Sequence, residues 1–219
     1  MFGPPSTALV VDLCGTLVRE NTTVGFVRWL RPKGWRGMQV RLGTSWVIGW
    51  IGNRVGIDLG RWLLVRSLTG IHRRALYDEG EAYVKDRLAR LASGRVLHAI
   101  QVAREYGRPV YLATATLDPV ARAVAEQLAL DGVVCSNLEY RETGECTGRL
   151  ARDITSRKWA TLHEIATSSA LTSMELYTDN AEDGDLIENA VRTFFLGVPA
   201  LLRDIEDRHR TRIVFVNGP

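Results

Sequence analysis

The sequence has few cysteines and no apolar run long enough to cross a membrane. Its cysteines are Cys14, Cys135 and Cys146. None forms a Cys-x-x-Cys pair, so neither a disulfide framework nor a zinc site is expected. The longest charge-free apolar stretch covers residues 42–53, whereas a membrane-spanning helix needs about 20 apolar residues. The first residues also lack the basic and apolar regions of a secretory signal. A soluble, cytoplasmic protein is therefore the default expectation.

Acidic residues are scarce in one part of the chain. Between Arg19 and Arg74 there are two Asp or Glu against eleven Lys or Arg, although the net charge of the whole chain is only +3. Five of the six tryptophans lie in the same segment. Such a local change in composition predicts a separate structural unit.

Three interpretations of this basic, Trp-rich segment remain open. Its tryptophans can pack a core of their own while the arginines stay solvated. The charge can instead attract an anionic substrate. In the third interpretation the segment contacts a membrane surface weakly, because Trp and Arg on amphipathic helices are typical of interfacial sites. No nucleic-acid-binding motif accompanies the charge, so nucleic acid is not an expected partner.

Strand and helix patterns alternate outside residues 19–94, which show helical spacing only. This alternation predicts an α/β core, a Rossmann-like, mostly parallel sheet flanked by helices, formed by residues 1–18 and 95–219. Residues 19–94 are predicted to form an inserted all-helical unit. The expected strands are 7–12, 109–113, 131–135, 174–178, 192–196 and 212–216, and a hairpin is expected at 138–150. The expected helices are 96–106, one that starts after Asp118 as its N-cap with Pro119 at its first position, 157–166, 183–189 and 201–208.

Polar residues follow three of the predicted strands. Asp12, Thr114 and Asp179 each stand where an apolar strand ends, and parallel sheets bind ligands at that edge. A carboxylate there can attack phosphorus as a nucleophile. Asp179 and Asp183 offer oxygen ligands for a hard cation such as Mg²⁺, and Lys158 offers a positive charge. Phosphoryl transfer needs mainly positioning and charge neutralisation, so this set predicts a phosphoryl-transfer site.

These residues belong to four motifs that occur in a fixed order. The chain thereby resembles the haloacid dehalogenase (HAD) superfamily of phosphatases over nearly its whole length. The 101 residues between Asp12 and Thr114 fit that superfamily's helical cap domain, inserted after the first motif. The motifs are Asp12-Leu13-Cys14-Gly15-Thr16, then Thr114-Ala115-Thr116 with Thr116 as the alternative to Thr114, then Lys158, and finally Asp179-Asn180-Ala181-Glu182-Asp183.

Two further stretches are similar to the phosphoserine-phosphatase-like branch. They are Thr114 to Val120 and the hairpin with Gly144 to Gly148. The resemblance implies a Mg²⁺-dependent phosphatase that acts on a small phosphorylated molecule through an aspartyl-phosphate intermediate. Asp12 would be the nucleophile, and Thr114 and Lys158 would hold the phosphoryl group. Mg²⁺ would be bound by Asp12, the backbone carbonyl of Cys14, Asp179 and Asp183.

Cys14 departs from the family pattern. The family has an Asp at this position that protonates the leaving oxygen and later activates water, and a thiol with a pKa near 8.5 is a poor substitute. Two alternatives to an ordinary phosphatase therefore stay open. One is a protein that binds or senses a phosphate ligand with impaired turnover, and the other is a peripheral membrane enzyme that acts on a lipid phosphate.

Overall fold

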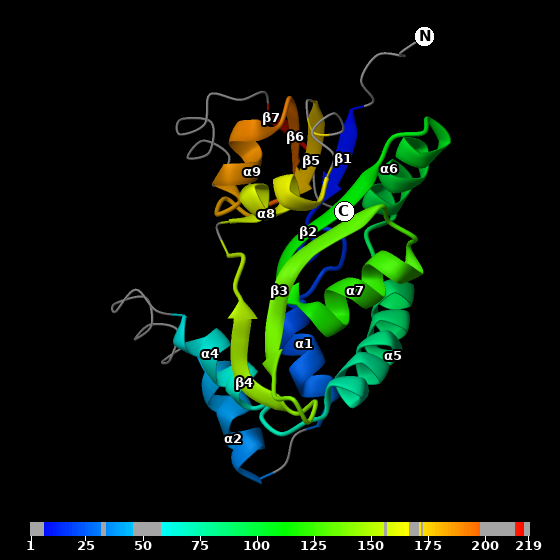
Figure 1. The fold of residues 1–219 in the computed structure, drawn as a ribbon. Coiled ribbons are helices and arrows are strands. Elements are labelled where there is room, and N and C mark those ends of the chain that lie inside the picture. Colours follow the sequence, from blue (N-terminus) through cyan, green and yellow to red (C-terminus); the bar gives the residue numbers. More distant parts are fainter. Residues whose placement is uncertain are drawn as a thin grey trace.

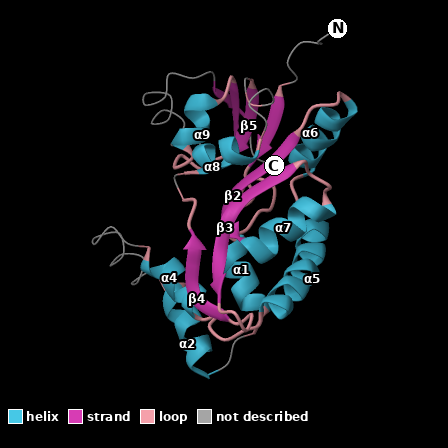
Figure 2. Ribbon diagram, viewed as in Figure 1, coloured by secondary structure: helices cyan, strands magenta, loops and turns pink. Residues whose placement is uncertain are grey.

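The computed structural model describes residues 7–31, 34–45, 58–155, 157–166, 171, 173–197 and 213–216. These residues form one seven-stranded sheet with the strand order β4-β3-β2-β1-β5-β6-β7 (Figures 1 and 2). All neighbouring strands are parallel except β3 and β4, which are antiparallel. The strands are β1 (Ala8–Val11), β2 (Val110–Leu117), β3 (Gly132–Tyr140), β4 (Cys146–Arg152), β5 (Met174–Thr178), β6 (Arg192–Phe195) and β7 (Ile213–Phe215).

Both faces of the sheet are covered, which explains why its central strands are apolar throughout. Leu9 and Val11 of β1 point into one buried cluster, while Ala8 and Val10 point into another. The first cluster includes side chains of α6 (Gly94–Glu105) and α7 (Asp118–Gln127). The second includes side chains of α8 (Lys158–Ile165) and α9 (Gly184–Asn189), and Figure 1 shows these helix pairs on opposite sides of β1.

Residues 19–94, called the helical segment below, contain no sheet strand among the described residues. The segment packs closely on the rest of the chain: α5 lies along α7, and α4 lies against β4 (Figure 1). The division into a core and an inserted cap at residues 19 and 94 stays a prediction. The described helices of the segment are α1 (Thr22–Trp29), α2 (Gly34–Gly43), α4 (Leu59–Arg66) and α5 (Arg73–Leu91).

Backbone hydrogen bonds fasten the β3–β4 hairpin to the helical segment. The amide of Gly70 donates to the carbonyl of Cys146 at 2.8 Å, and the amide of Cys146 donates to the carbonyl of Ile71 at 2.9 Å. The amide of Arg73 donates to the carbonyl of Gly144, where the hairpin turns with a positive φ of 85°. The hairpin predicted at 138–150 is therefore present, and it supports the start of α5.

Most predicted elements occur within a few residues of their expected bounds, with two differences. β2 and β3 are longer than expected, and Thr114 consequently lies within β2 rather than after it. Asp118 does not cap α7 but is its first residue, because its buried carboxylate accepts hydrogen bonds from the Leu138 amide at 2.9 Å and the Tyr77 hydroxyl at 2.6 Å. The helix expected at 201–208 lies outside the described residues.

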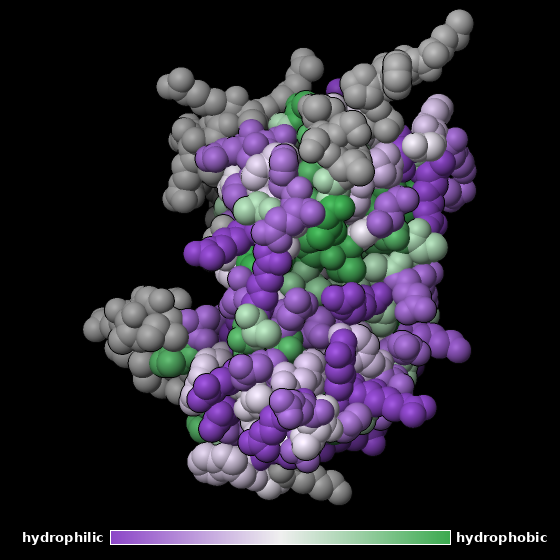
Figure 3. Space-filling model, in the orientation of Figure 1, coloured by the Kyte–Doolittle hydropathy of each residue, from purple (hydrophilic) through white to green (hydrophobic). Residues whose placement is uncertain are grey.

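Figure 3 shows that the face seen in Figure 1 is largely polar, and that its most extensive apolar area lies where β2 and β3 run side by side. Among the described residues, no helix is both long enough and apolar enough to cross a bilayer.

Candidate active site

The predicted site residues meet at the carboxyl edge of the parallel strands. Val11, the last residue of β1, pairs with Leu112 of β2 and with Tyr177 of β5. Asp12 therefore leaves the sheet level with Ala113 and Thr178, the residues directly before Thr114 and Asp179. Because parallel strands share their orientation, side chains that are distant in sequence meet at this edge.

Lys158 lies buried between two carboxylates. Its Nζ atom is 2.7 Å from Oδ1 of Asp12 and 2.7 Å from Oδ1 of Asp183. Burial disfavours the ammonium, but the two carboxylates outweigh that effect and raise the pKa of Lys158. The neighbouring Arg157 is exposed, so of these two adjacent basic residues it is Lys158 that contacts Asp12.

Lys158, Asp12 and Asp183 form one buried ion-pair group. Burial raises the pKa of Asp12 to about 7, with Lys158 opposing the shift and the charges of Asp183 and Asp179 adding to it. The other oxygen of Asp183, Oδ2, accepts a hydrogen bond from the Thr178 hydroxyl at 2.8 Å. Both oxygens of Asp183 are thus occupied by protein partners, whereas Oδ2 of Asp12 has no described partner.

Gly15 allows the loop after β1 to approach Asp179. It has a positive φ of 75°, and a Cβ atom at this position would lie 1.9 Å from Oδ2 of Asp179. The hydroxyl of Thr16 donates to Oδ1 of the same carboxylate at 2.9 Å. Burial raises the pKa of Asp179, and the Thr16 hydrogen bond opposes this shift. The loop therefore holds Asp179 in place through a side chain and leaves Oδ2 to face the loop backbone.

Cys14 lies in a closed group of hydroxyls. Its Sγ atom is 2.8 Å from Oγ1 of Thr22 and 3.1 Å from Oγ1 of Thr116, and these two oxygens are 2.7 Å apart. The hydroxyl of Thr114 donates to Oγ1 of Thr116 at 3.1 Å. Burial and the nearby Asp12 charge raise the pKa of the Cys14 thiol, against hydrogen bonds with Thr116 and Thr22.

The site opens into a hollow of about 830 Å³ between the sheet edge and the helical segment. Arg61 of α4 lines it and reaches the core, where its Nη2 atom donates to the Ala115 carbonyl at 2.7 Å and to the Ser136 hydroxyl at 2.8 Å. Its Nε atom is buried without a hydrogen-bond partner among the described residues. Other residues around this hollow are Asp12, Cys14, Thr114, Thr116, Lys158, Asp179 and Asp183.

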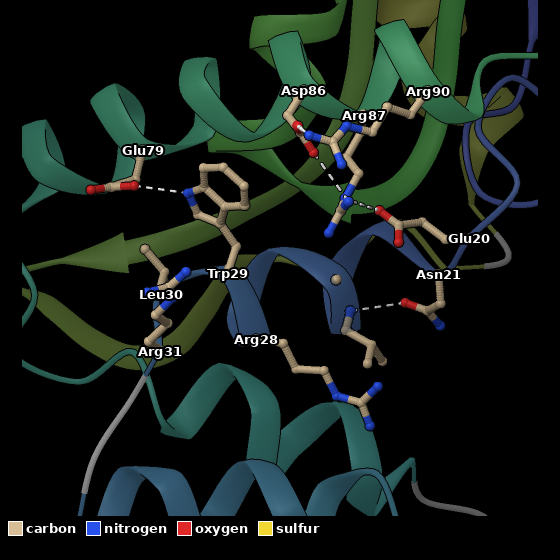
Figure 4. Close-up of a pocket in the computed structure, with 12 residues that line it drawn as sticks. Glu20, Asn21, Arg28, Trp29, Leu30, Arg31, Glu79, Asp86, Arg87 and Arg90 are labelled. Carbon is tan, nitrogen blue, oxygen red and sulfur yellow. Dashed lines mark hydrogen bonds and ion pairs between the residues drawn. The ribbon is translucent and has the colours of Figure 1, made fainter.

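A second hollow, of about 1020 Å³, lies between α1 and α5 (Figure 4). Two arginines of α5 form ion pairs here: Arg87 lies 2.9 Å from Glu20, and Arg90 lies 2.8 Å from Asp86. Arg28 and Arg31 also line this hollow and have no ion pair with a described acidic residue. Trp29 donates from Nε1 to Glu79 at 2.9 Å. This hollow contains none of the predicted site residues. The Trp29 hydrogen bond joins α1 to α5, and the Arg87 ion pair joins α5 to the residues just before α1.

The sequence missed several residues that build the site. Thr22 and Arg61 come from the helical segment, whose motifs the sequence pattern does not reveal. Thr16 and Thr178 stand beside predicted residues and anchor Asp179 and Asp183. Thr16 follows Gly15 in the first motif, so its place in the loop was the one signal that could have identified it.

The oxygens at this edge suit a hard cation. Among the described residues, no group of three or more His, Cys, Asp or Glu side chains is arranged to hold a metal by itself. Mg²⁺, however, usually binds one or two carboxylates and completes its shell with waters and substrate phosphates. Asp12 and Asp179 each keep an oxygen without a described side-chain partner, whereas both oxygens of Asp183 are occupied. The donor set therefore fits Mg²⁺ through two carboxylates, with Asp183 as a supporting residue instead of a ligand.

Comparison with known proteins identifies relatives of this chain. A sequence model described as haloacid dehalogenase-like hydrolase matches residues 9–186. No curated protein matches the sequence.

Several solved structures share the fold at low sequence identity. A protein of unknown function from Bordetella pertussis Tohama I aligns with a TM-score of 0.79 and 16% identity, covering 97% of this chain and 99% of that one. A phospho-aspartyl intermediate analogue of phosphoserine phosphatase aligns with a TM-score of 0.66 and 16% identity, covering 98% and 96%. Cytosolic 5′-nucleotidase IIIB bound to cytidine aligns with a TM-score of 0.68 and 14% identity, covering 96% and 80%.

Proposed function

The chain belongs to the haloacid dehalogenase-like hydrolases, and from this premise we propose that it is a phosphatase acting on a small phosphorylated molecule. Asp12 is the nucleophile. Its carboxylate attacks phosphorus, the bond from phosphorus to the leaving oxygen breaks, and the phosphoryl group is carried on Asp12 until water releases it. The fold shared with phosphoserine phosphatase and a 5′-nucleotidase supports this class of reaction.

The observation that carries the proposal is the contact between Lys158 and Asp12. Lys158 holds one oxygen of Asp12 at 2.7 Å, and Asp183 holds Lys158 from the other side. An ammonium fixed in this way orients the nucleophile and neutralises charge on a phosphoryl group beside it. Because phosphoryl transfer depends on positioning and electrostatic stabilisation, a buried and charge-balanced lysine suits this chemistry.

The other residues that line the hollow would hold the phosphoryl group and the metal ion. Thr114 and Thr116 line it beside Asp12, and a hydroxyl there can donate to a phosphoryl oxygen. Asp12, Asp179 and the backbone carbonyl of Cys14 would hold Mg²⁺, with Asp183 in support. When bound, Mg²⁺ would supply positive charge that neutralises the phosphate.

Cys14 limits which substrates react well. The carboxyl group that serves as proton donor in the family is replaced by a thiol held by Thr22 and Thr116. Losing a positioned acid or base typically reduces the rate by about 10²–10⁴-fold. Substrates whose leaving group needs no proton, such as aryl or acyl phosphates, avoid this loss and should be hydrolysed faster than alkyl phosphates.

The test is hydrolysis of an aryl phosphate, an acyl phosphate and an alkyl phosphate by the purified chain with Mg²⁺. The Asp12→Asn variant is the control, because it keeps the shape of the side chain and removes the nucleophile. Phosphate release that depends on Asp12 and is lost with a chelator is the expected result. Equal rates for the two proteins would refute the proposal.

The position of Cys14 also supports a second candidate, a protein that binds a phosphate ligand and turns it over poorly. This candidate predicts that phosphate protects the wild-type protein against thermal unfolding while no substrate is hydrolysed above background. Phosphate protection that disappears in Lys158→Met, without measurable turnover in the wild type, would favour it over the phosphatase.

A further inference from the structure

Helix α2 exposes a stripe of large apolar side chains. Trp35 is 68% exposed, Met38 is 45% exposed and Leu42 is 44% exposed. These residues, called the α2 stripe below, are separated by three and four positions, so they lie on one face of the helix. Exposed apolar residues that gather on one face mark an interaction surface far more often than single ones do.

The stripe is not the result of a poorly packed helix. Helix α2 buries Gln39 and Val40. At the end of the helix, Gly43 meets Gly60 of α4 so closely that a Cβ atom on either residue would lie within 2.8 Å of the other's carbonyl oxygen. Helix α2 is therefore docked through one face and presents Trp35, Met38 and Leu42 outward.

Three exposed arginines gather beside the stripe. Arg28 and Arg31, at the end of α1, line a hollow of about 790 Å³ together with Arg41, Met38 and Leu42 of α2. In Figure 4 the side chain of Arg28 points from α1 away from α5. No ion pair joins any of these arginines to a described acidic residue, and the sequence from Asn21 to Ile57 contains neither Asp nor Glu.

The hollow between α1 and α5 provides an internal comparison. There, Arg87 pairs with Glu20 and Arg90 pairs with Asp86, so these two arginines of α5 are balanced within the protein. Arg28 and Arg31 line that hollow as well, but neither has an ion pair with a described acidic residue. Beside the α2 stripe the basic groups have no such balance. Unpaired guanidinium groups next to exposed apolar side chains match a partner with negative charge at its surface and an apolar layer beneath.

We propose that the α2 stripe and the arginines Arg28, Arg31 and Arg41 dock the protein on the surface of an anionic phospholipid bilayer. The arginines contact lipid phosphates, because one guanidinium group can donate two parallel hydrogen bonds to two oxygens of the same phosphate. Trp35 enters the headgroup region, where its amphipathic ring is favoured, and Met38 and Leu42 reach the upper acyl chains. The helix lies in the surface and does not cross the bilayer. Docking does not depend on the proposed phosphatase activity.

The test is flotation of the full chain with vesicles at about 0.1 M salt, where charges separated by more than about 10 Å are screened. One set of vesicles is pure phosphatidylcholine and the other contains about a third phosphatidylglycerol, whose negative charge attracts basic side chains. We expect binding to the second set only, and a loss of binding as salt is raised.

Two variants with the same change in charge separate this surface from general attraction. Arg31→Glu with Arg41→Glu reverses two positive charges beside the stripe. Lys85→Glu with Arg122→Glu makes the same change on α5 and α7, which lie across the lower part of Figure 1 from α2. The first pair should reduce vesicle binding by more than about tenfold and the second only slightly. Equal losses in both pairs, or no binding by the wild type, would overturn the proposal.

Trp35→Ala tests the apolar part, with Tyr106→Ala as control because Tyr106 is also largely exposed. Weaker vesicle binding is expected for Trp35→Ala alone. Sedimentation of the lipid-free protein supplies the remaining outcome. A wild-type dimer that Trp35→Ala converts to a monomer would mean that a second copy of the chain covers the stripe, and this result would also overturn the proposal.

Discussion

The sulfur of Cys14 lies 2.8 Å from the hydroxyl oxygen of Thr22, so the loop after β1 is joined to the first residue of α1. Thr116 of β2 closes the group from the sheet side. The residue that replaces the expected acid is thus held by partners from both the core and the helical segment. These partners could equally donate hydrogen bonds to a carboxylate.

Cys14→Asp should raise the rate of alkyl phosphate hydrolysis. The new carboxyl group would sit against the Thr22 and Thr116 hydroxyls and restore a proton donor beside Asp12. The expected increase is about 10²–10⁴-fold, the usual contribution of a positioned acid or base. Steady-state rates with Mg²⁺ measure it, and Cys14→Ser is the control because it keeps the hydrogen bonds without the acid. A rate no higher than that of Cys14→Ser would contradict the prediction.

Lys158→Met should abolish activity and destabilise the protein. It leaves the carboxylates of Asp12 and Asp183 buried without their cation. Removing one partner of a buried ion pair typically costs about 3–5 kcal/mol of unfolding free energy. Denaturant unfolding measures this cost, and Arg157→Met is the matched control because its side chain is exposed at the adjacent position. Equal stability losses in the two variants would argue against the buried ion-pair group.

Gly15→Ala should destabilise the protein more than a Gly→Ala substitution at another glycine that has a positive φ. Its methyl group would overlap the Asp179 carboxylate, so the loop or Asp179 must move. Gly107→Ala is the control, because Gly107 also has a positive φ but open space around its α-carbon. We expect the free energy of unfolding to fall by about 1 kcal/mol in Gly107→Ala and by more in Gly15→Ala. Thermal unfolding compares the two, and activity should fall only in Gly15→Ala.

Arg61→Met should loosen the contact between α4 and the sheet. It removes the hydrogen bonds to Ala115 and Ser136 at the edge of the active-site hollow. Leaving the two acceptors unpaired should lower the free energy of unfolding by about 1–3 kcal/mol. Arg66→Met, on the same helix, is the control, since its side chain makes no hydrogen bond or ion pair with a described residue. A comparable loss of stability in both variants would show that the Arg61 hydrogen bonds contribute little.

Gly60→Ala should weaken the docking of α2 on α4. The added methyl group would come within 2.7 Å of the Gly43 carbonyl oxygen, which is backbone and cannot turn aside. Overpacking of this kind costs about 1–3 kcal/mol. Gly94→Ala is the control, because nothing lies near its α-carbon. Denaturant unfolding should show a lower free energy of unfolding for Gly60→Ala alone. A similar free energy of unfolding in both variants would mean that the close contact between α2 and α4 does not contribute to stability.

Much of the fold could be predicted from the sequence because its signals are local. The apolar strand before Asp12 and the strand at 174–178 stand out by composition alone, and β5 has the predicted bounds. The order of the motifs indicates that Asp12, Thr114, Lys158 and Asp179 share one edge of the sheet. Sequence analysis was less accurate where long-range contacts override local preference. Asp118 resembles a helix cap, yet its carboxylate is used by Tyr77 and Leu138.

The sequence alone predicts the α/β core, a candidate site at the carboxyl edge of its strands and the basic, Trp-rich composition of residues 19–74. These features follow from local periodicity and composition and from the order of the motifs along the chain, and none of these requires knowledge of contacts between distant residues. Contacts between distant residues bury Lys158 between Asp12 and Asp183 and place Cys14 against Thr22 and Thr116. They also leave Trp35 exposed beside arginines that have no ion pair with a described acidic residue. Burial and pairing depend on which distant residues meet, and that is set by packing of the whole chain.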